Sequence, residues 1–131
     1  MTAAVHTSAG TYVVDLEAEA VVGNADDFVP PRVDVELPRV VAAAQAGATI
    51  VALIDRRPPL AISNDAGSTW REAGGGLPVG FAIAIDEDNP DRMLFAARNR
   101  LYLSENGGVF WRVLVPELPE IYSIRFVPDQ G

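Results

Sequence analysis

The feature that most constrains this chain is an internal repeat with a spacing of 41 residues. Residues 62–70 (ISNDAGSTW) align with residues 103–111 (LSENGGVFW) without a gap. The identical positions are a Ser, a Gly and a Trp, namely Ser63, Gly67 and Trp70 in the first copy and Ser104, Gly108 and Trp111 in the second. A repeat of this length predicts structural units that each contact their neighbours and share one architecture.

Each unit has the pattern of four short strands joined by turns. The alternating apolar run at residues 80–86 aligns with residues 40–44 one spacing earlier and with Ile124 and Phe126 one spacing later. Within the second unit, further strands are expected at residues 93–97, 101–104 and 110–115, and in the first unit near residues 49–54, 60–63 and 69–72. Four short antiparallel strands per unit are typical of a β-propeller blade. The sequence therefore predicts an all-β protein built from such blades.

Both ends of the chain continue this register, and we expect a single domain. Subtracting 41 residues from the second, third and fourth strands of the first unit predicts strands at residues 7–14, 19–22 and 28–33. Residues 22–28 would then be a decayed copy of the turn at residues 62–70. The expected divisions are a degenerate partial blade over residues 1–38, blades over residues 39–79 and 80–120, and the first strand of a further blade over residues 121–131.

The chain is too short to close a propeller by itself. Propellers have about 4 to 8 blades, and four units of this spacing exceed the 131 residues. Because an unpaired strand edge favours aggregation, our hypothesis is a homodimer that forms a six-bladed ring. In it, the C-terminal strand of each chain completes the N-terminal blade of the other. The alternatives are a fragment of a longer protein and an open stack of sheets.

The turn at residues 63–70 resembles a known motif. Its pattern, Ser-x-Asp-x-Gly-x-Thr-Trp, is similar to the Asp-box of the bacterial neuraminidase repeat. That repeat is found in sialidases, sortilin-type receptors and photosystem II assembly-factor propellers. The stretch from residue 83 to residue 108 resembles the segment between two boxes. The resemblance implies a propeller fold, in which the box is a hairpin turn on the outside of a blade and remote from any ligand site.

Ten residues of the two boxes are expected to have structural roles. They are Ser63, Asp65, Gly67, Thr69 and Trp70 in the first box, and Ser104, Asn106, Gly108, Phe110 and Trp111 in the second. The oxygen at the third position can accept hydrogen bonds from its own turn, and the Gly can take a positive φ. Each Trp is expected to bury its ring beside the turn. Since the second box lacks the Asp and the Thr, we expect its turn to survive with one hydroxyl fewer.

Composition excludes several classes of function. A net charge of -8, with ten Arg and no Lys, disfavours nucleic acid as a partner and rules out lysine chemistry. The absence of Cys rules out a thiolate nucleophile. No apolar stretch is long enough to span a membrane, and no signal peptide is recognisable. We therefore expect no membrane partner and a cytoplasmic location by default, with secretion as the open alternative.

Three arginines are candidate ligand-binding residues. Arg57 and Arg98 occupy equivalent turns one spacing apart, and Arg100 lies beside the second. Such residues can bind carboxylated sugars or phosphate through bidentate contacts, although solvated turn arginines are the commoner outcome. The acidic cluster at residues 86–91 does not have the spacing of a calcium loop. We predict no metal and no cofactor.

No catalytic set is recognisable. A sialidase-like site needs an arginine cluster, a tyrosine with a partner glutamate, and an acid, and no tyrosine here stands in such a motif. His6, the sole histidine, is expected in a disordered or edge segment and has no nucleophile partner. The sequence thus predicts a noncatalytic Asp-box repeat protein, a binding or assembly scaffold for a protein or glycan partner that also self-associates. The alternative is a carbohydrate-active enzyme of the sialidase or glycosidase type, or a degenerate relative of one.

Overall fold

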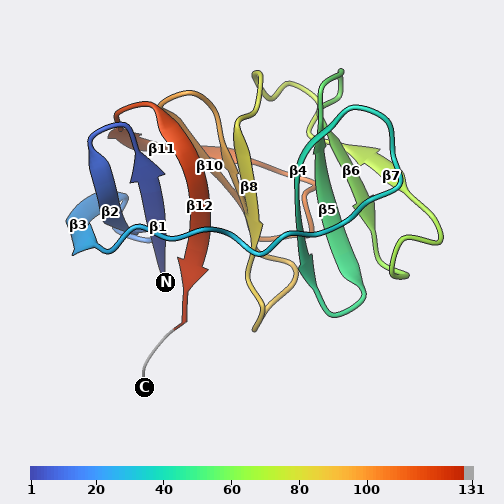
Figure 1. Cartoon of the computed structure of the whole chain (residues 1–131), viewed down its shortest axis with the longest axis horizontal. Coiled ribbons are helices and arrows are strands. Elements are labelled where there is room, and N and C mark those ends of the chain that lie inside the picture. The colour runs from blue at the N-terminus through green and yellow to red at the C-terminus, as the bar shows by residue number, and fades with distance from the viewer. Residues whose placement is uncertain (129–131) are drawn as a thin grey trace.

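The computed structural model describes residues 1–128, which form three four-stranded antiparallel sheets (Figure 1). The N-terminal sheet has the order β12 (Ile121–Val127), β1 (Thr2–Thr7), β2 (Gly10–Asp15), β3 (Ala20–Ala25). The first repeat sheet contains β4 (Val40–Ala46), β5 (Thr49–Ile54), β6 (Leu60–Ser63) and β7 (Arg71–Ala73). The second repeat sheet contains β8 (Ala82–Ile85), β9 (Met93–Ala96), β10 (Arg100–Ser104) and β11 (Arg112–Glu117).

The expected all-β class and the four-stranded antiparallel blades are confirmed. In both repeat sheets the strands pair in the order in which they occur in the chain, as the 41-residue unit predicts. Residues 1–128 contain no helix that is long and apolar enough to cross a membrane. The end of the range expected for the last strand, residues 129–131, lies outside the described residues.

The N-terminal sheet is complete, and the repeat register placed two of its strands. The strands expected at residues 7–14 and 19–22 overlap β2 at residues 10–15 and β3 at residues 20–25. The strand expected at residues 28–33 is wrong, and β1 at residues 2–7 was not expected. Residues 22–28, expected as a decayed turn, divide between β3 and the segment that follows it. The physical reason is that β12 lies along β1 from Thr2↔Val127 to Thr7↔Ile121. This pairing draws the first residues of the chain into the sheet.

In this structure β12 pairs with β1 of its own chain, whereas the exchange that we expected would pair it with the N-terminal sheet of a second copy, and association of two chains stays a prediction. The connection from β3 to β4, residues 26–38, makes the pairing within one chain possible. It crosses in front of β12 and β8 to reach the first repeat sheet at the far side of the molecule (Figure 1). We call residues 26–38 the crossing segment. After the two repeat sheets, the chain returns as β12 to pair with β1.

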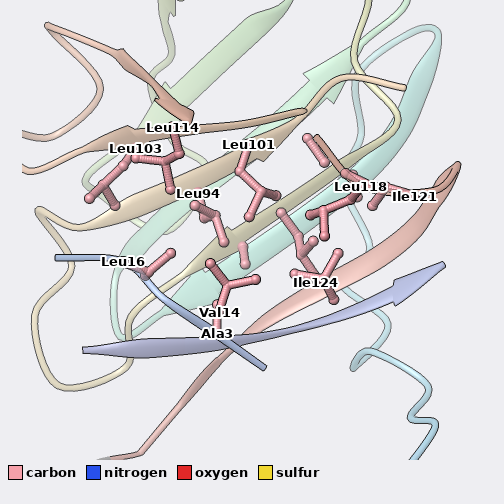
Figure 2. Packing of buried hydrophobic residues seen from close by; sticks show 14 residues of the cluster. Ala3, Val14, Leu16, Leu94, Leu101, Leu103, Leu114, Leu118, Ile121 and Ile124 are labelled. Carbon is pink, nitrogen blue, oxygen red and sulfur yellow. The ribbon is translucent and has the colours of Figure 1, made fainter. Parts of the chain in front are cut away.

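The second repeat sheet lies in the middle of the stack and is buried on both faces. Strand β8 shows this directly, since Ala82 and Ala84 belong to the core on one side and Ile83 and Ile85 to the core on the other. Figure 2 shows the first core, between the second repeat sheet and the N-terminal sheet, where side chains of the two sheets interdigitate; examples are Leu94, Leu101, Leu114, Val14, Ile121 and Ile124. The second core joins Met93 and Phe95 to Leu53, Leu60 and Ile62 of the first repeat sheet.

The crossing segment covers the outer faces of the two end sheets. Val35 and Leu37 pack against the small buried side chains of the first repeat sheet. At the other end sheet, the ring centroid of Phe28 lies 6.3 Å from that of His6 and 5.0 Å from Cζ of Arg125. His6 is therefore not in a disordered or edge segment, because β1 is an inner strand and the His6 side chain is 29% exposed.

The closure of the N-terminal sheet by β12 can be tested through its core contacts. Ile121 is 1% exposed, so Ile121→Ala should lower the free energy of unfolding by about 2–5 kcal/mol, as for other large-to-small core changes. The control Val115→Ala removes a side chain that is 70% exposed and should stay within about 0.5 kcal/mol of the parent. Denaturant titration measures both, and equal stabilities of the two variants would contradict the burial of β12.

Candidate functional site

A channel runs along β4, β8 and β12, which are edge strands of the three sheets. Strands β4, β8 and β12 lie side by side, and together with residues 30–35 of the crossing segment they surround two adjoining hollows of about 360 and 530 Å³. The hollows share walls from four parts of the chain, formed by Pro30, Pro31, Val33, Ala43, Ile83 and Ile124. We call the two together the central channel. The first hollow meets the ends of the three strands and the second meets their beginnings, so the strands run in the same direction.

Charged side chains lie mainly at the first hollow. Asp86, Glu87 and Asp88 line it from a single turn, and Arg125 lines it from β12. Part of this set is already engaged, since Asp86 Oδ1 accepts a hydrogen bond from the Asp88 amide at 2.9 Å and Asp86 Oδ2 lies 3.6 Å from Nη1 of Arg92. Nε of Arg125 is buried and has no hydrogen-bond partner. Within residues 1–128, no group of three or more His, Asp or Glu side chains could hold a metal ion.

The two hollows differ in the character of their lining. The exposed lining of the first hollow is mostly apolar, and that of the second is mostly polar. An apolar lining with a few polar groups, as at the first hollow, is the usual make-up of ligand pockets. Glycoside hydrolysis needs two carboxyl groups that flank the scissile bond. The carboxylates of the first hollow instead follow one another in the same turn. In the second hollow, Asp34 is paired with Arg32 at 3.2 Å.

The three candidate arginines lie at the end of the sheets where β4, β8 and β12 begin. Arg57 is in the β5–β6 connection and Arg98 in the β9–β10 connection, and antiparallel pairing brings these connections to the same end. Both side chains are exposed, whereas Arg100 Nη2 lies 3.3 Å from Oε1 of Glu117. Arg57 lines a hollow of about 230 Å³ that neither Arg98 nor Arg100 reaches. The structure thus brings the three to one end but not around one ligand, and their role in binding stays a prediction.

The first turn motif is organised around Asp65. Its Oδ1 accepts hydrogen bonds from Ser63 Oγ at 2.7 Å and from the Thr69 amide at 2.8 Å, and its Oδ2 accepts one from Thr69 Oγ1. The Gly67 amide donates to Ser63 Oγ at 2.8 Å, and Gly67 has a φ of +94°. The Thr69 hydroxyl, the Thr69 amide and the Ser63 hydroxyl favour the ionised carboxylate and lower the pKa of Asp65 to about 2. Trp70 packs at the edge of the outer core of the first repeat sheet.

The second turn motif repeats this network with one hydroxyl fewer. Asn106 Oδ1 accepts hydrogen bonds from Ser104 Oγ at 3.0 Å and from the Phe110 amide at 2.9 Å, and the Gly108 amide donates to Ser104 Oγ. Trp111 Nε1 donates to the Gly108 carbonyl at 2.9 Å, and its ring packs beside Phe95. Both Trp rings are half-buried, so they cover the edges of the cores instead of filling them. The Phe110 side chain is 76% exposed.

Sequence reasoning missed the channel and the aromatic contacts beside it. Tyr122 lines the second hollow, and its ring centroid lies 5.6 Å from that of His6. Asp27 lies 3.8 Å from Nε2 of His6 and accepts a hydrogen bond from Thr11 Oγ1, so it fastens the crossing segment to β1 and β2. The repeat spacing did contain one signal, since Tyr122 follows Phe81 by 41 residues. Nothing local indicates where the crossing segment lies.

No protein-family model and no curated protein matches the chain. Among solved structures, the chain is similar to the GH74 enzyme of Niastella koreensis, with 22% sequence identity and a TM-score of 0.48. The match covers 84% of this chain and 17% of that enzyme, so the chain spans about a sixth of its length. The assignment of the two turns to the Asp-box repeat family stays a prediction, and we infer no activity from this similarity.

The lowered pKa of Asp65 predicts an acid-sensitive contribution to stability. Because the fold lowers this pKa from 3.8 to about 2, the ionised carboxylate stabilises the native state above pH 3.8, and the contribution is lost as the pH falls toward 2. In denaturant titrations, Asp65→Asn should be less stable than the parent near neutral pH, and the difference should shrink in acid. The reverse change, Asn106→Asp, should make the second turn acid-sensitive. A stability difference that is independent of pH would contradict this role.

The two neighbouring glycines of the second turn differ in the space around them. A Cβ at Gly108 would lie 2.5 Å from Cδ1 of the buried Ile62, whereas a Cβ at Gly107 would lie 3.5 Å from its nearest neighbour, Oδ1 of Asp91. Both residues have positive φ, at +86° and +72°, so backbone strain is similar in the two alanine variants. Gly108→Ala should therefore be less stable than Gly107→Ala by about 1–3 kcal/mol, the usual cost of overpacking. Thermal or denaturant unfolding of both variants measures this difference, and equal losses would show that the Ile62 contact does not constrain the turn.

Proposed function

We propose that the chain is a noncatalytic binding module that takes an extended segment of a protein partner into the central channel. The observation that carries this proposal is the channel itself, which has walls from all three sheets and from the crossing segment. Its hollows, of about 360 and 530 Å³, fall in the size range of ligand pockets, about 300–1,000 Å³.

The lining favours an apolar protein segment over a glycan. Sugars present hydroxyl groups around their rings, and a buried hydroxyl without a hydrogen-bond partner is unfavourable. The walls common to both hollows belong to proline, valine, alanine and isoleucine residues, and the exposed lining of the first hollow is mostly apolar. The first hollow therefore suits aliphatic or aromatic side chains of a partner. The acidic turn at residues 86–88 and Arg125, at the first hollow, can then orient the segment through its polar groups.

A channel-filling variant tests this proposal. Gln45 lines the first hollow and is exposed, so Gln45→Trp should obstruct it, while Ala48→Trp places the same ring at an exposed position of the next turn. Peptides selected on the parent protein from a phage-displayed random library are the probes, and a glycan array is the comparison. We expect the selected peptides to bind Gln45→Trp at least tenfold more weakly than Ala48→Trp. Equal binding to both variants, or binding of glycans alone, would contradict the proposal.

The enzymatic alternative has its own test. Fluorogenic glycosides, sialosides included, should show no turnover above a heat-inactivated control, because the carboxylates of the first hollow all come from one turn and not from two sides of a scissile bond. Turnover that disappears on changing a single Glu, Asp or Tyr of the channel would establish a carbohydrate-active enzyme and overturn the noncatalytic function.

A further inference from the structure

The turn between β10 and β11 exposes two large apolar side chains together. Val109 is 62% and Phe110 76% exposed. In the first motif, the position of Phe110 is occupied by Thr69, whose hydroxyl donates to Asp65. Phe110 donates only its backbone amide, to Asn106 Oδ1, so its ring is not needed for the hydrogen bonds of the turn. We call residues 105–110 the Phe110 turn.

Carboxylates accompany these apolar side chains. Glu105 belongs to the Phe110 turn and is exposed, and the carbonyl of Asp91 accepts a hydrogen bond from the Gly107 amide at 2.9 Å. The Asp91 residue closes the acidic connection between β8 and β9. Arg71 also reaches this turn, since its Nη2 donates a hydrogen bond to the Gly107 carbonyl at 2.6 Å. The Phe110 turn therefore presents an aromatic ring and a valine beside two carboxylates and one arginine.

A hollow of matching character lies at the opposite end of the sheets. It measures about 230 Å³ and lies where the first and second repeat sheets meet, with apolar walls that include Leu77, Pro78 and Val79. Val41 and Val79 are 53% and 64% exposed at its edge. Arg56 and Arg57 line it as well, and among the described residues neither forms an ion pair. Asp55 is the carboxylate in its lining. We call it the arginine hollow.

Charge is distributed unevenly between the two ends of the molecule. The net charge is -8, and the end with the arginine hollow carries half of the arginines, Arg39, Arg56, Arg57, Arg98 and Arg100, against Asp55, Glu117 and Glu120. At the end with the Phe110 turn the acidic side chains outnumber the arginines; it carries Asp65, Asp86, Glu87, Asp88, Asp91 and Glu105 against Arg71, Arg92 and Arg112. Opposite ends of two copies therefore attract one another, while two acidic ends repel.

We propose that the arginine hollow receives the Phe110 turn of a second copy of this chain, so that copies associate head to tail. The Phe110 ring enters between the valines of the hollow, and the carboxylates of the Phe110 turn meet Arg56 and Arg57. Within one chain the two surfaces lie at opposite ends and do not meet. Each added copy leaves one hollow and one turn free, so the contact extends into longer assemblies or closes into a ring. This inference goes beyond the proposed function, because the arginine hollow shares only Val41 with the central channel.

The association is tested by sedimentation equilibrium and light scattering over a range of concentrations. The mass of the parent protein should rise above the 14.0 kDa of one chain as concentration increases, and added salt should reverse the rise. Phe110→Thr, which introduces the residue of the first motif, should remain at the mass of one chain. The double variant Arg56→Glu, Arg57→Glu should do the same. The control Val115→Thr changes a valine that is 70% exposed elsewhere and should associate like the parent.

Mixing the two defective proteins distinguishes a head-to-tail contact from a symmetric one. Phe110→Thr keeps an intact hollow and the arginine variant keeps an intact turn, so an equimolar mixture can form one contact and no more. We expect a 1:1 complex of twice 14.0 kDa that does not grow further. Circular dichroism and unfolding curves check that each variant is folded. A parent protein that stays at the mass of one chain up to about 1 mM, the range of weak affinities, would overturn the proposal. A mixture that stays at the mass of one chain would overturn it as well.

Discussion

The pairing of β12 with β1 is the interaction on which the rest of this structure depends. It joins the two ends of the chain in one sheet and satisfies the backbone groups of β1 that would otherwise form an open edge. It also places Ile121 and Ile124 in the core against the second repeat sheet. The crossing segment makes this pairing possible. It carries the chain to the far side of the stack, so that the two repeat sheets follow and β12 returns beside β1 (Figure 1). Since the crossing segment then lies over β12 and β8, the same constraint creates the central channel.

The repeat sheets could be predicted from the sequence, and the N-terminal sheet only in part, since β2 and β3 were expected and β1 was not. In the repeats, the turn chemistry at Ser63 and Ser104 fixes where two strands end, and alternation in β8 reveals a strand buried on both faces. The bounds of β1 instead depend on β12, which is paired in space and distant in sequence, and no local pattern encodes that register. The turn residues were predictable for the same reason as the repeat sheets. The channel was not, because its walls come from four separate segments, and Pro30 and Pro31 have no place in the repeat.

The two turn motifs show how one framework can serve different surfaces. Both use a side-chain oxygen to accept hydrogen bonds within the turn, and the first adds the Thr69 hydroxyl, which accounts for the strongly lowered pKa of Asp65. Loss of that hydroxyl in the second motif leaves the turn closed and its Phe110 ring in solvent. The proposed functions follow this division. The channel offers a path along β4, β8 and β12 that is mostly apolar at the first hollow, and the two ends of the sheets differ in their balance of charge.

The most direct test of this account is whether β12 closes the sheet within its own chain. The protein has no cysteine, so the double variant Thr2→Cys, Val127→Cys places a single pair of thiols at directly opposed positions of β1 and β12. After oxidation of a dilute sample, the account predicts a disulfide within one chain, seen by mass spectrometry and non-reducing electrophoresis at 14.0 kDa. A disulfide that links two chains instead would show that the strand is exchanged and would contradict the closure described here.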